Sequence, residues 1–299
     1  MIFFFLLSFL ISIVAIPFLI SLSNKKKFFD FPEGDKLKIH RSPISFLGGT
    51  AMLLAIIVPF LFIGVSNFKF IDLALCCSII FSVGLWDDIK WKQISSKNPS
   101  RKPYDKLFFL ILCSLVAAAV LFFAGVKLYL FPILAFFYIF VLINAVNYQD
   151  GMDGQAGFLV LISLLGFWVL SIISNNIFSL SILPILIGAI FGFLVYNFPP
   201  AKIFMGDSGA YLLGFVLAVF AIIFSKDILS GLFILGLPLF DGVYTNLRRV
   251  LRGKSIFLGD REHFFDKMLA RGFSVKKTLF ISCVSQVVFV AVGILLYIY

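Results

Sequence analysis

Residues 155–173 read QAGFLVLISLLGFWVLSII and carry no charged side chain. A helix needs about 20 mainly apolar residues to cross the hydrocarbon core of a bilayer. It also satisfies its own backbone hydrogen-bonding groups there, which lipid cannot do for an irregular segment. This stretch therefore predicts a transmembrane helix.

Nine further stretches share its length and hydropathy. They predict an all-α fold, a polytopic integral membrane protein of about ten transmembrane helices that form a single domain over residues 1–299. The first stretch is too long for a signal peptide and lacks a basic start and a cleavage site, so we expect it to be retained. The expected spans are residues 2–22, 46–64, 70–86, 106–124, 128–144, 155–173, 178–195, 208–225, 228–245 and 278–298.

The composition leads to the same class of protein. Hydrophobic residues make up 61% of the chain and charged residues 13%, and the mean hydropathy is +1.08. Soluble domains have roughly 45–50% apolar and about 25% charged residues. An ordinary water-soluble globule is therefore excluded. The four cysteines lie in apolar runs, which predicts neither disulfides nor a metal finger.

The basic residues predict the orientation. Of the 25 Lys and Arg residues, 22 fall in alternate connections, and the other connections hold only Lys69, Lys127 and Lys226. By the positive-inside rule the first set is cytoplasmic and both termini are external. The net charge of +10 is thereby explained by topology, so it implies no nucleic-acid partner. The basic set of connections comprises 23–45, 87–106, 145–154, 196–207 and 246–277.

The acidic residues gather on the same predicted side, since only Asp72 and Asp227 lie elsewhere. An ion-coupled transporter would need ionisable groups near the middle of the bilayer, often in repeated halves. The sequence shows neither feature. Any chemistry is therefore expected at the cytoplasmic surface.

Two acidic segments are candidates for that chemistry. Asp87 and Asp88 end the expected span 70–86, and neighbouring carboxylates are suited to a base or to a site facing a cation. Residues 144–154 read NAVNYQDGMDG, with no basic residue, and offer oxygen ligands and close backbone approach. A solvated helix end and an ordinary turn remain the respective alternatives.

Two further segments could bind phosphate. Residues 204–209 read FMGDSG and open an expected helix, whose N-terminus favours anions while Asp207 could hold a hard cation. Simple capping by Asp207 is compatible with that role. After Asp241, the segment 246–277 carries Arg248 and Arg249, which could hold phosphate oxygens, and His263, which could donate to a leaving phosphate.

In this order the segments resemble the polyprenyl-phosphate N-acetylhexosamine-1-phosphate transferases, in particular the undecaprenyl-phosphate GlcNAc-1-phosphate transferases of glycosyltransferase family 4. The resemblance extends from residues 30–40 to His263, over nearly the whole chain. It implies a ten- or eleven-helix fold in the plasma (inner) membrane with external termini. It also implies a cytoplasmic active site that uses Mg²⁺, with Mn²⁺ as the alternative.

The resemblance further implies the reaction. Such an enzyme transfers N-acetylhexosamine 1-phosphate, here expected to be GlcNAc 1-phosphate, from a UDP-sugar to undecaprenyl phosphate and releases UMP. This step initiates a cell-envelope glycan, and whether that is O-antigen of lipopolysaccharide or another polymer stays open. The expected partners are a UDP-N-acetylhexosamine, undecaprenyl phosphate and the lipid bilayer, and a homodimer is also open.

Residue roles follow from the matching motifs. Asp207 is expected to be the principal metal ligand, helped by Asn147, and Asp87 and Asp88 to be the catalytic pair. In related proteins a carboxylate of the 144–154 segment is also discussed as a nucleophile, but we favour single-step attack by the lipid phosphate. The other expected site residues are Asp150, Asp153 and His263 in catalysis, and Asn144, Asn147, Lys97, Lys106, Arg248, Arg249 and Arg261 in substrate binding.

One departure from the family pattern affects the last motif. Phe264, Phe265 and Asp266 follow His263 where family members often carry several histidines, so the phosphate-side role could fall to Arg261. The triple-histidine pattern of phospho-N-acetylmuramoyl-pentapeptide transferase is absent, which favours an N-acetylhexosamine donor. That transferase and a non-enzymatic transporter of lipid-linked sugars remain the alternatives. A CDP-alcohol phosphatidyltransferase is disfavoured because no Ala-Arg follows Gly151.

Overall fold

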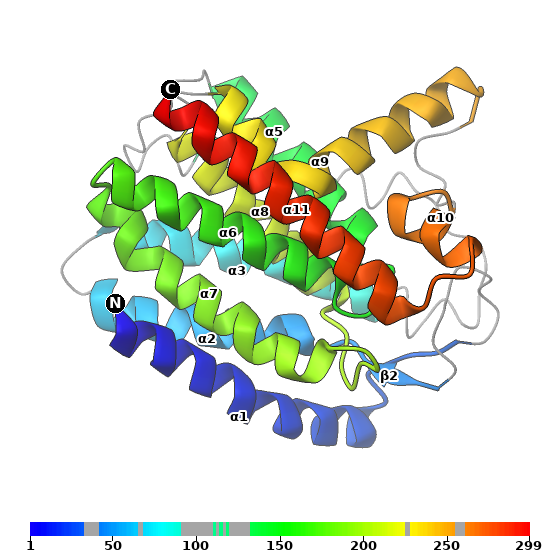
Figure 1. Cartoon of the computed structure of the whole chain (residues 1–299). Coiled ribbons are helices and arrows are strands. Elements are labelled where there is room, and N and C mark those ends of the chain that lie inside the picture. Colours follow the sequence, from blue (N-terminus) through cyan, green and yellow to red (C-terminus); the bar gives the residue numbers. More distant parts are fainter. Residues whose placement is uncertain are drawn as a thin grey trace.

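The chain folds as a bundle of long helices with a small two-stranded antiparallel sheet at one end (Figure 1). The computed structural model describes residues 1–32, 42–64, 68–90, 110–111, 114–115, 118–119, 132–224, 228–254 and 261–299. Over these ranges the named elements are α1 (Ile2–Lys26), β1 (Phe29–Asp30), β2 (Ile44–Ser45), α2 (Gly48–Gly64), α3 (Phe68–Asp88), α5 (Pro132–Gln149), α6 (Gln155–Ile173), α7 (Ile177–Asn197), α8 (Gly206–Ile223), α9 (Ile228–Leu251), α10 (Phe264–Ala270) and α11 (Val275–Ile298).

These helices confirm the all-α, multi-pass membrane fold. Among the described residues, seven helices are long and apolar enough to cross a membrane, and α2 and α5 contain shorter apolar segments. Each of these nine helices lies on a predicted span. The expected span 106–124 falls largely outside the described ranges, so the total of ten spans stays a prediction.

Helix α5 differs most from expectation. Residues 145–149 are predicted as part of a loop, but α5 continues through them to Gln149, so that prediction is wrong. Asparagine often favours turns because its side chain competes for backbone groups. Here Asn144 instead donates from Nδ2 to the Phe140 carbonyl one turn earlier, at 2.7 Å, and the helix continues. The polar residues of the segment therefore lie on a helical turn.

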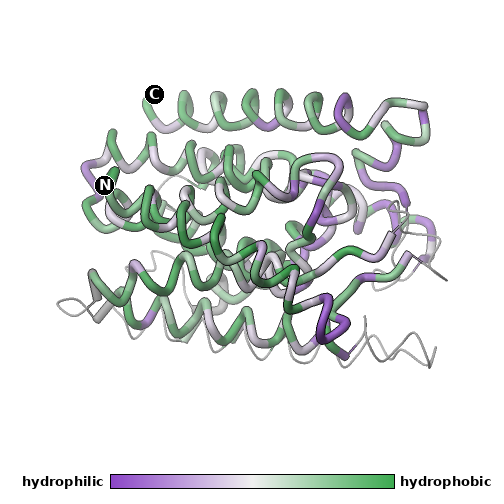
Figure 2. Tube along the Cα trace, turned by 90° about the horizontal axis from the view of Figure 1, so that it is seen from below, coloured by the Kyte–Doolittle hydropathy of each residue, from purple (hydrophilic) through white to green (hydrophobic). Residues whose placement is uncertain are grey.

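The polar connections gather at one end of the bundle. Hydrophilic residues lie at the end that carries α10 and the small sheet, while the N- and C-termini lie at the opposite end (Figures 1 and 2). The described parts of the basic connections lie at the α10 end, which agrees with the predicted alternation. The compartment that each end faces is still the prediction of the positive-inside rule.

Helix α8 forms the centre of the bundle. Within the described structure, 89% of its apolar window is buried, compared with 22% for α1. Close approach to its neighbours depends on small residues, since a Cβ on Gly49 or Gly84 would lie 2.5 Å from α8 backbone atoms. Small residues at helix contacts are typical of membrane bundles. The first turn of α8 is therefore held rigidly between α2 and α3.

Helix α9 is broken near its middle. Gly236 has φ 50° and ψ −131°, outside the helical region, and Pro238 follows it. The side chain of Gln286, from α11, is fully buried against this break. Its Oε1 accepts from Leu237 N at 2.7 Å and its Nε2 donates to the Ile234 carbonyl at 3.0 Å. A side-chain amide thus replaces the helical hydrogen bonds that the break removes, as apolar surroundings require.

Replacing Gln286 by Leu is expected to destabilise the folded protein by about 2 kcal/mol, because the backbone groups of Ile234 and Leu237 would lose their buried partner. Thermal unfolding in detergent would measure the change. Ser285→Ala is the matched control, since Ser285 bonds to its own helix at the Ile281 carbonyl. Equal melting temperatures for the two variants would contradict the role of Gln286.

Candidate active site

The N-terminus of α8 is fastened by Asp88, from the end of α3. Asp88 is fully buried, and its two carboxylate oxygens accept from the backbone N–H groups of Asp207 (2.9 Å) and Ser208 (3.0 Å). Gly206 has φ +71°, and a Cβ there would lie 2.5 Å from Asp88 Oδ2. A carboxylate at a helix N-terminus supplies acceptors for the free N–H groups and complements the dipole. Asp88 therefore positions Asp207.

The other member of the acidic pair also faces α8. Asp87 is 2% exposed and accepts from the Tyr211 hydroxyl at 3.2 Å. The pair and Asp207 are thus brought together, as the sequence motifs predict. The two carboxylates have different partners, since Asp88 holds backbone groups and Asp87 holds a side chain.

Asp207 also meets α5. Asn147 Nδ2 donates to Asp207 Oδ1 at 2.9 Å, which joins the last turn of α5 to the first turn of α8. Asn144 lies one turn earlier and bonds within its own helix. Of the two asparagines predicted for the site, Asn147 is therefore the one that contacts Asp207.

A second carboxylate organises the loops. Asp153 Oδ2 accepts from Ala201 N at 2.9 Å, which ties the α5–α6 connection to the α7–α8 connection. Asn197 strengthens this tie by accepting from Gly154 N and donating to the Ile203 carbonyl. Asp150 is half-buried at the start of the same connection. The structure thus gives Asp153 a role in shaping the site, while Asn197 has no predicted role.

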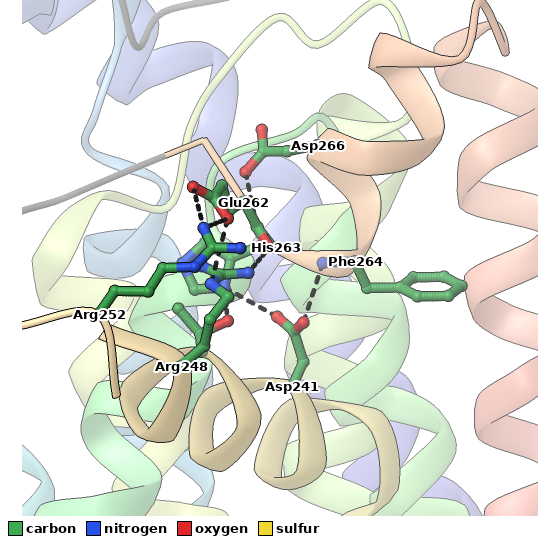
Figure 3. Close-up of polar contacts among 8 residues, drawn as sticks. Asp241, Arg248, Arg252, Glu262, His263, Phe264 and Asp266 are labelled. Atoms are coloured by element: carbon green, nitrogen blue, oxygen red, sulfur yellow. Dashed lines mark hydrogen bonds and ion pairs between the residues drawn. The ribbon is translucent and has the colours of Figure 1, made fainter. Parts of the chain in front are cut away.

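His263 lies in a buried polar cluster at the start of α10 (Figure 3). Its Nδ1 lies 2.8 Å from Asp241 Oδ2, and Asp241 Oδ1 accepts from Phe264 N at 2.9 Å. Gln149 Nε2 also donates to Asp241 Oδ2, at 2.8 Å. The sequence draws attention to Asp241 without giving it a role, and it offers no signal for Gln149 beyond its place in the polar segment.

The arginines lie at the end of α9. Arg248 and Arg249 are 8% and 2% exposed, and Arg249 lies over the Tyr148 ring at 5.6 Å. Arg248 pairs with Glu262 at 3.1 Å, and Arg252 with the same carboxylate at 2.9 Å (Figure 3). Arg261 is exposed next to this cluster. Lys97 and Lys106, also predicted to bind substrate, lie outside the described residues.

The last turn of α5 joins both sides of the site. Asn147 contacts Asp207, and Tyr148 lies against the His263 ring with 5.2 Å between centroids. The next residue, Gln149, bonds to Asp241. Successive residues of a helix point about 100° apart, so one turn can contact three partners. The last turn of α5 therefore connects the carboxylate of α8 to the polar cluster of α9 and α10.

Burial changes the acid–base behaviour of one neighbour. Desolvation raises the pKa of the Asp266 carboxyl above its ordinary value, and the negative charge of Asp241 acts in the same direction. His263 and Arg261 oppose this rise through their charges. The cluster around His263 therefore contains a carboxylate that gains a proton more readily than a solvated one.

The side chains at Asp207 fit a divalent cation whose remaining ligands would come from substrate phosphates and water. Among the described residues there is no group of three or more His, Cys, Asp or Glu side chains that could form a metal cage. Mg²⁺ is usually bound through one or two carboxylates, with substrate phosphates and waters as the other ligands. Asp207 offers the carboxylate that this kind of binding needs. Asn147 holds it through Nδ2 and could join the cation only through its amide oxygen.

Comparisons with known proteins identify a family and several relatives that match most of the chain. The model of the family described as glycosyl transferase family 4 matches residues 70–225, which run from α3 to α8. A Bacillus subtilis (strain 168) protein described as a probable undecaprenyl-phosphate N-acetylglucosaminyl 1-phosphate transferase is 27% identical, with 93% of this chain and 79% of the relative covered. Two phospho-N-acetylmuramoyl-pentapeptide-transferases are also similar, from Streptococcus sanguinis (30% identical, 73% and 72% covered) and Streptococcus mutans (32%, 74% and 72%).

Proposed function

Because the chain belongs to glycosyl transferase family 4, we propose that it transfers N-acetylhexosamine 1-phosphate from a UDP-sugar to undecaprenyl phosphate and releases UMP. GlcNAc is the favoured sugar, because it is named in the description of the Bacillus subtilis relative. The observation that carries the proposal is the last turn of α5, which joins Asp207 to the cluster of His263 and Arg249. In this proposal Asp207 would be the cation ligand, and the groups at the other side of the turn would bind phosphate.

The reaction joins two anions, so its main physical difficulty is the electrostatic repulsion between them. The lipid phosphate oxygen attacks the phosphorus that carries the sugar, a new P–O bond forms, and the bond to the UMP oxygen breaks. Asp207 and Asn147 would hold Mg²⁺ or Mn²⁺, which supplies charge neutralisation on the diphosphate. Arg248, Arg249 and Arg261 would bind the phosphate oxygens, and His263 would donate to the leaving UMP phosphate.

The acidic residues have different proposed roles in the reaction. A phosphate monoester has its second pKa near about 6, so at neutral pH the attacking lipid phosphate needs little proton removal. Asp87 is the candidate to accept that proton, while Asp88 holds the first turn of α8 in place. Asp150 and Asp153 lie on the connection proposed to face the nucleotide. This assignment needs no covalent aspartyl intermediate.

Placement in the membrane supports the same proposal. The site lies at the end of the bundle that holds most of the described polar connections, where a lipid headgroup can enter while its tail stays among the helices. The positive-inside rule makes this end cytoplasmic and both termini external. We therefore place the protein in the plasma (inner) membrane, with its active site facing the cytoplasm.

Transfer of phospho-N-acetylmuramoyl-pentapeptide is the second candidate, because several relatives carry that description at 30–32% identity. The last motif argues against it. Phe265 packs beside Gly151, where a Cβ would lie 2.6 Å from the Phe265 ring, and is parallel to the His263 ring. The position after Phe264 therefore fills an apolar contact instead of offering a further imidazole.

Turnover measured with a panel of UDP-sugar donors tests this proposal. Purified full-length protein in bilayers with undecaprenyl phosphate is expected to release UMP and form a lipid-linked product with UDP-GlcNAc or another UDP-N-acetylhexosamine. Turnover with UDP-N-acetylmuramoyl-pentapeptide alone would establish the second candidate. Absence of UMP release with every donor, despite movement of lipid-linked sugar across the bilayer, would favour a transporter.

A further inference from the structure

Asp241 lies on α9 at the side of the polar cluster that contains His263, and it contacts His263 and Phe264 (Figure 3). It lies on α9 just beyond the break at Gly236 and is 6% exposed. Three groups from two other parts of the chain reach its carboxylate: Gln149 Nε2 of α5, and His263 Nδ1 and Phe264 N at the start of α10. A single side chain thus connects three segments of the site.

The contacts of Asp241 determine how the His263 ring is protonated. The amide of Gln149 and the backbone of Phe264 can only donate to it, so Asp241 acts as an acceptor on both oxygens. His263 must then carry its proton on Nδ1 to make the 2.8 Å contact. Nε2 is left as the ring nitrogen that can meet a ligand.

The orientation of the ring is fixed as well as its protonation. Tyr148 lies 5.2 Å from the His263 ring centroid, and Phe265 is parallel to it at 6.0 Å. His263 is 5% exposed, which leaves little room for ring rotation. The ring therefore has one defined position relative to α5 and α9.

We propose that Asp241 is a positioning residue of the transfer reaction, which holds His263 with Nδ1 protonated and stabilises its charged form while Nε2 donates to the phosphate that leaves with UMP. This inference rests on the proposed function. It goes beyond it because Asp241 acts through His263 and does not touch the substrate. If Asp241 only held α5, α9 and α10 together, its substitution and that of Gln149 would have the same effects on kcat and on the pH profile.

Other titratable groups lie on the segments that pack around the imidazole. They could change the effect of Asp241, so their positions matter for the choice of controls. They are Arg248 and Arg249 of α9, Tyr148 of α5, Asp266 of α10, and Arg261 and Glu262 in the segment before α10.

Asp241→Asn is the decisive variant. Its single amide oxygen cannot accept from both His263 Nδ1 and Phe264 N, and the side chain carries no charge, so kcat is expected to fall about 10- to 100-fold while KM for the UDP-sugar changes little. The alkaline limb of the pH–kcat profile is expected to move to lower pH, because the charged imidazole loses its carboxylate partner. Unchanged kcat, or a loss of kcat with an unmoved alkaline limb, would overturn the proposal.

Gln149→Met distinguishes a positioning role of Asp241 from a purely structural one. It removes one donor to Asp241 but leaves the contact between Asp241 and His263 in place. We expect it to keep the wild-type alkaline limb, with melting temperature as the check on folding. If Gln149→Met reproduces both the kcat loss and the profile of Asp241→Asn, the tie alone accounts for the effect and the proposal fails.

A spectroscopic readout tests the inference without turnover. The chain has two histidines, His40 and His263, so ¹⁵N-histidine labelling gives two imidazoles that His40→Gln would assign. His263 is expected to show a protonated Nδ1 in the wild type and an altered tautomer in Asp241→Asn. An unprotonated Nδ1 in the wild type would overturn the inference, whereas a wild type that releases no UMP with any donor would count against the proposed function.

Discussion

Asp207→Asn is expected to reduce UMP release at least about 1,000-fold, because a loss of about 4 kcal/mol of charge stabilisation corresponds to that factor. The change removes the carboxylate that contacts Asn147 Nδ2 and that would hold the cation. The bond from Asp207 N to Asp88 uses the backbone, so the first turn of α8 should remain in place. A folded but inactive protein is the expected result.

Melting temperature, membrane insertion and Mg²⁺ dependence of turnover would be measured on the same preparation. Asp72→Asn is the matched control, since it removes a carboxylate near the opposite end of α3 and outside the site. The control should retain wild-type turnover. Substantial UMP release by Asp207→Asn would refute the assignment of Asp207 as the cation ligand.

Asp88→Asn is expected to have a large but different effect. The two carboxylate oxygens of Asp88 accept from backbone N–H groups at 2.9 and 3.0 Å, and an amide can offer an acceptor to only one of them. The other N–H would face a donor in a buried place, at a cost of about 2–3 kcal/mol. We expect a lower melting temperature, because the folded state loses this bond. We also expect an approximately 100-fold loss of turnover, since a displaced Asp207 would raise the activation free energy by about 2–3 kcal/mol.

The two aspartate variants can be told apart. Asp207→Asn should lose turnover and keep its stability, whereas Asp88→Asn should lose both, because only Asp88 holds the helix end. If Asp88→Asn melts like the wild type and yet loses turnover as Asp207→Asn does, Asp88 contacts the reacting groups directly. Its assignment as a positioning residue would then be wrong.

Much of the fold follows from hydrophobic runs, since a stretch such as 155–173 has one stable form in lipid. The sequence also places Asp207 correctly at a helix start and Asp88 at a helix end, because charged residues mark the ends of apolar spans. It fails at residues 145–149, where turn-forming side chains lie within a helix. Local preference there is overridden by contacts that α5 makes with distant segments.

The sequence alone could not show which residues from distant segments contact one another. Pro238 hints at an irregular α9, but nothing in the order of residues identifies Gln286, 49 residues after Leu237, as the partner of that break. Likewise, Asp241 and His263 are separated by 22 residues, and their contact depends on how α10 docks. Such pairings are set by packing in three dimensions.

The polar end of α5 limits how this chain can vary. Asn147, Tyr148 and Gln149 reach their partners only at one rotational phase of the helix. Inserting or deleting one residue earlier in α5 would rotate this turn by about 100° and carry all three side chains away together. Substitutions along the lipid-facing side of α5 should thus be tolerated, whereas changes in its length should not.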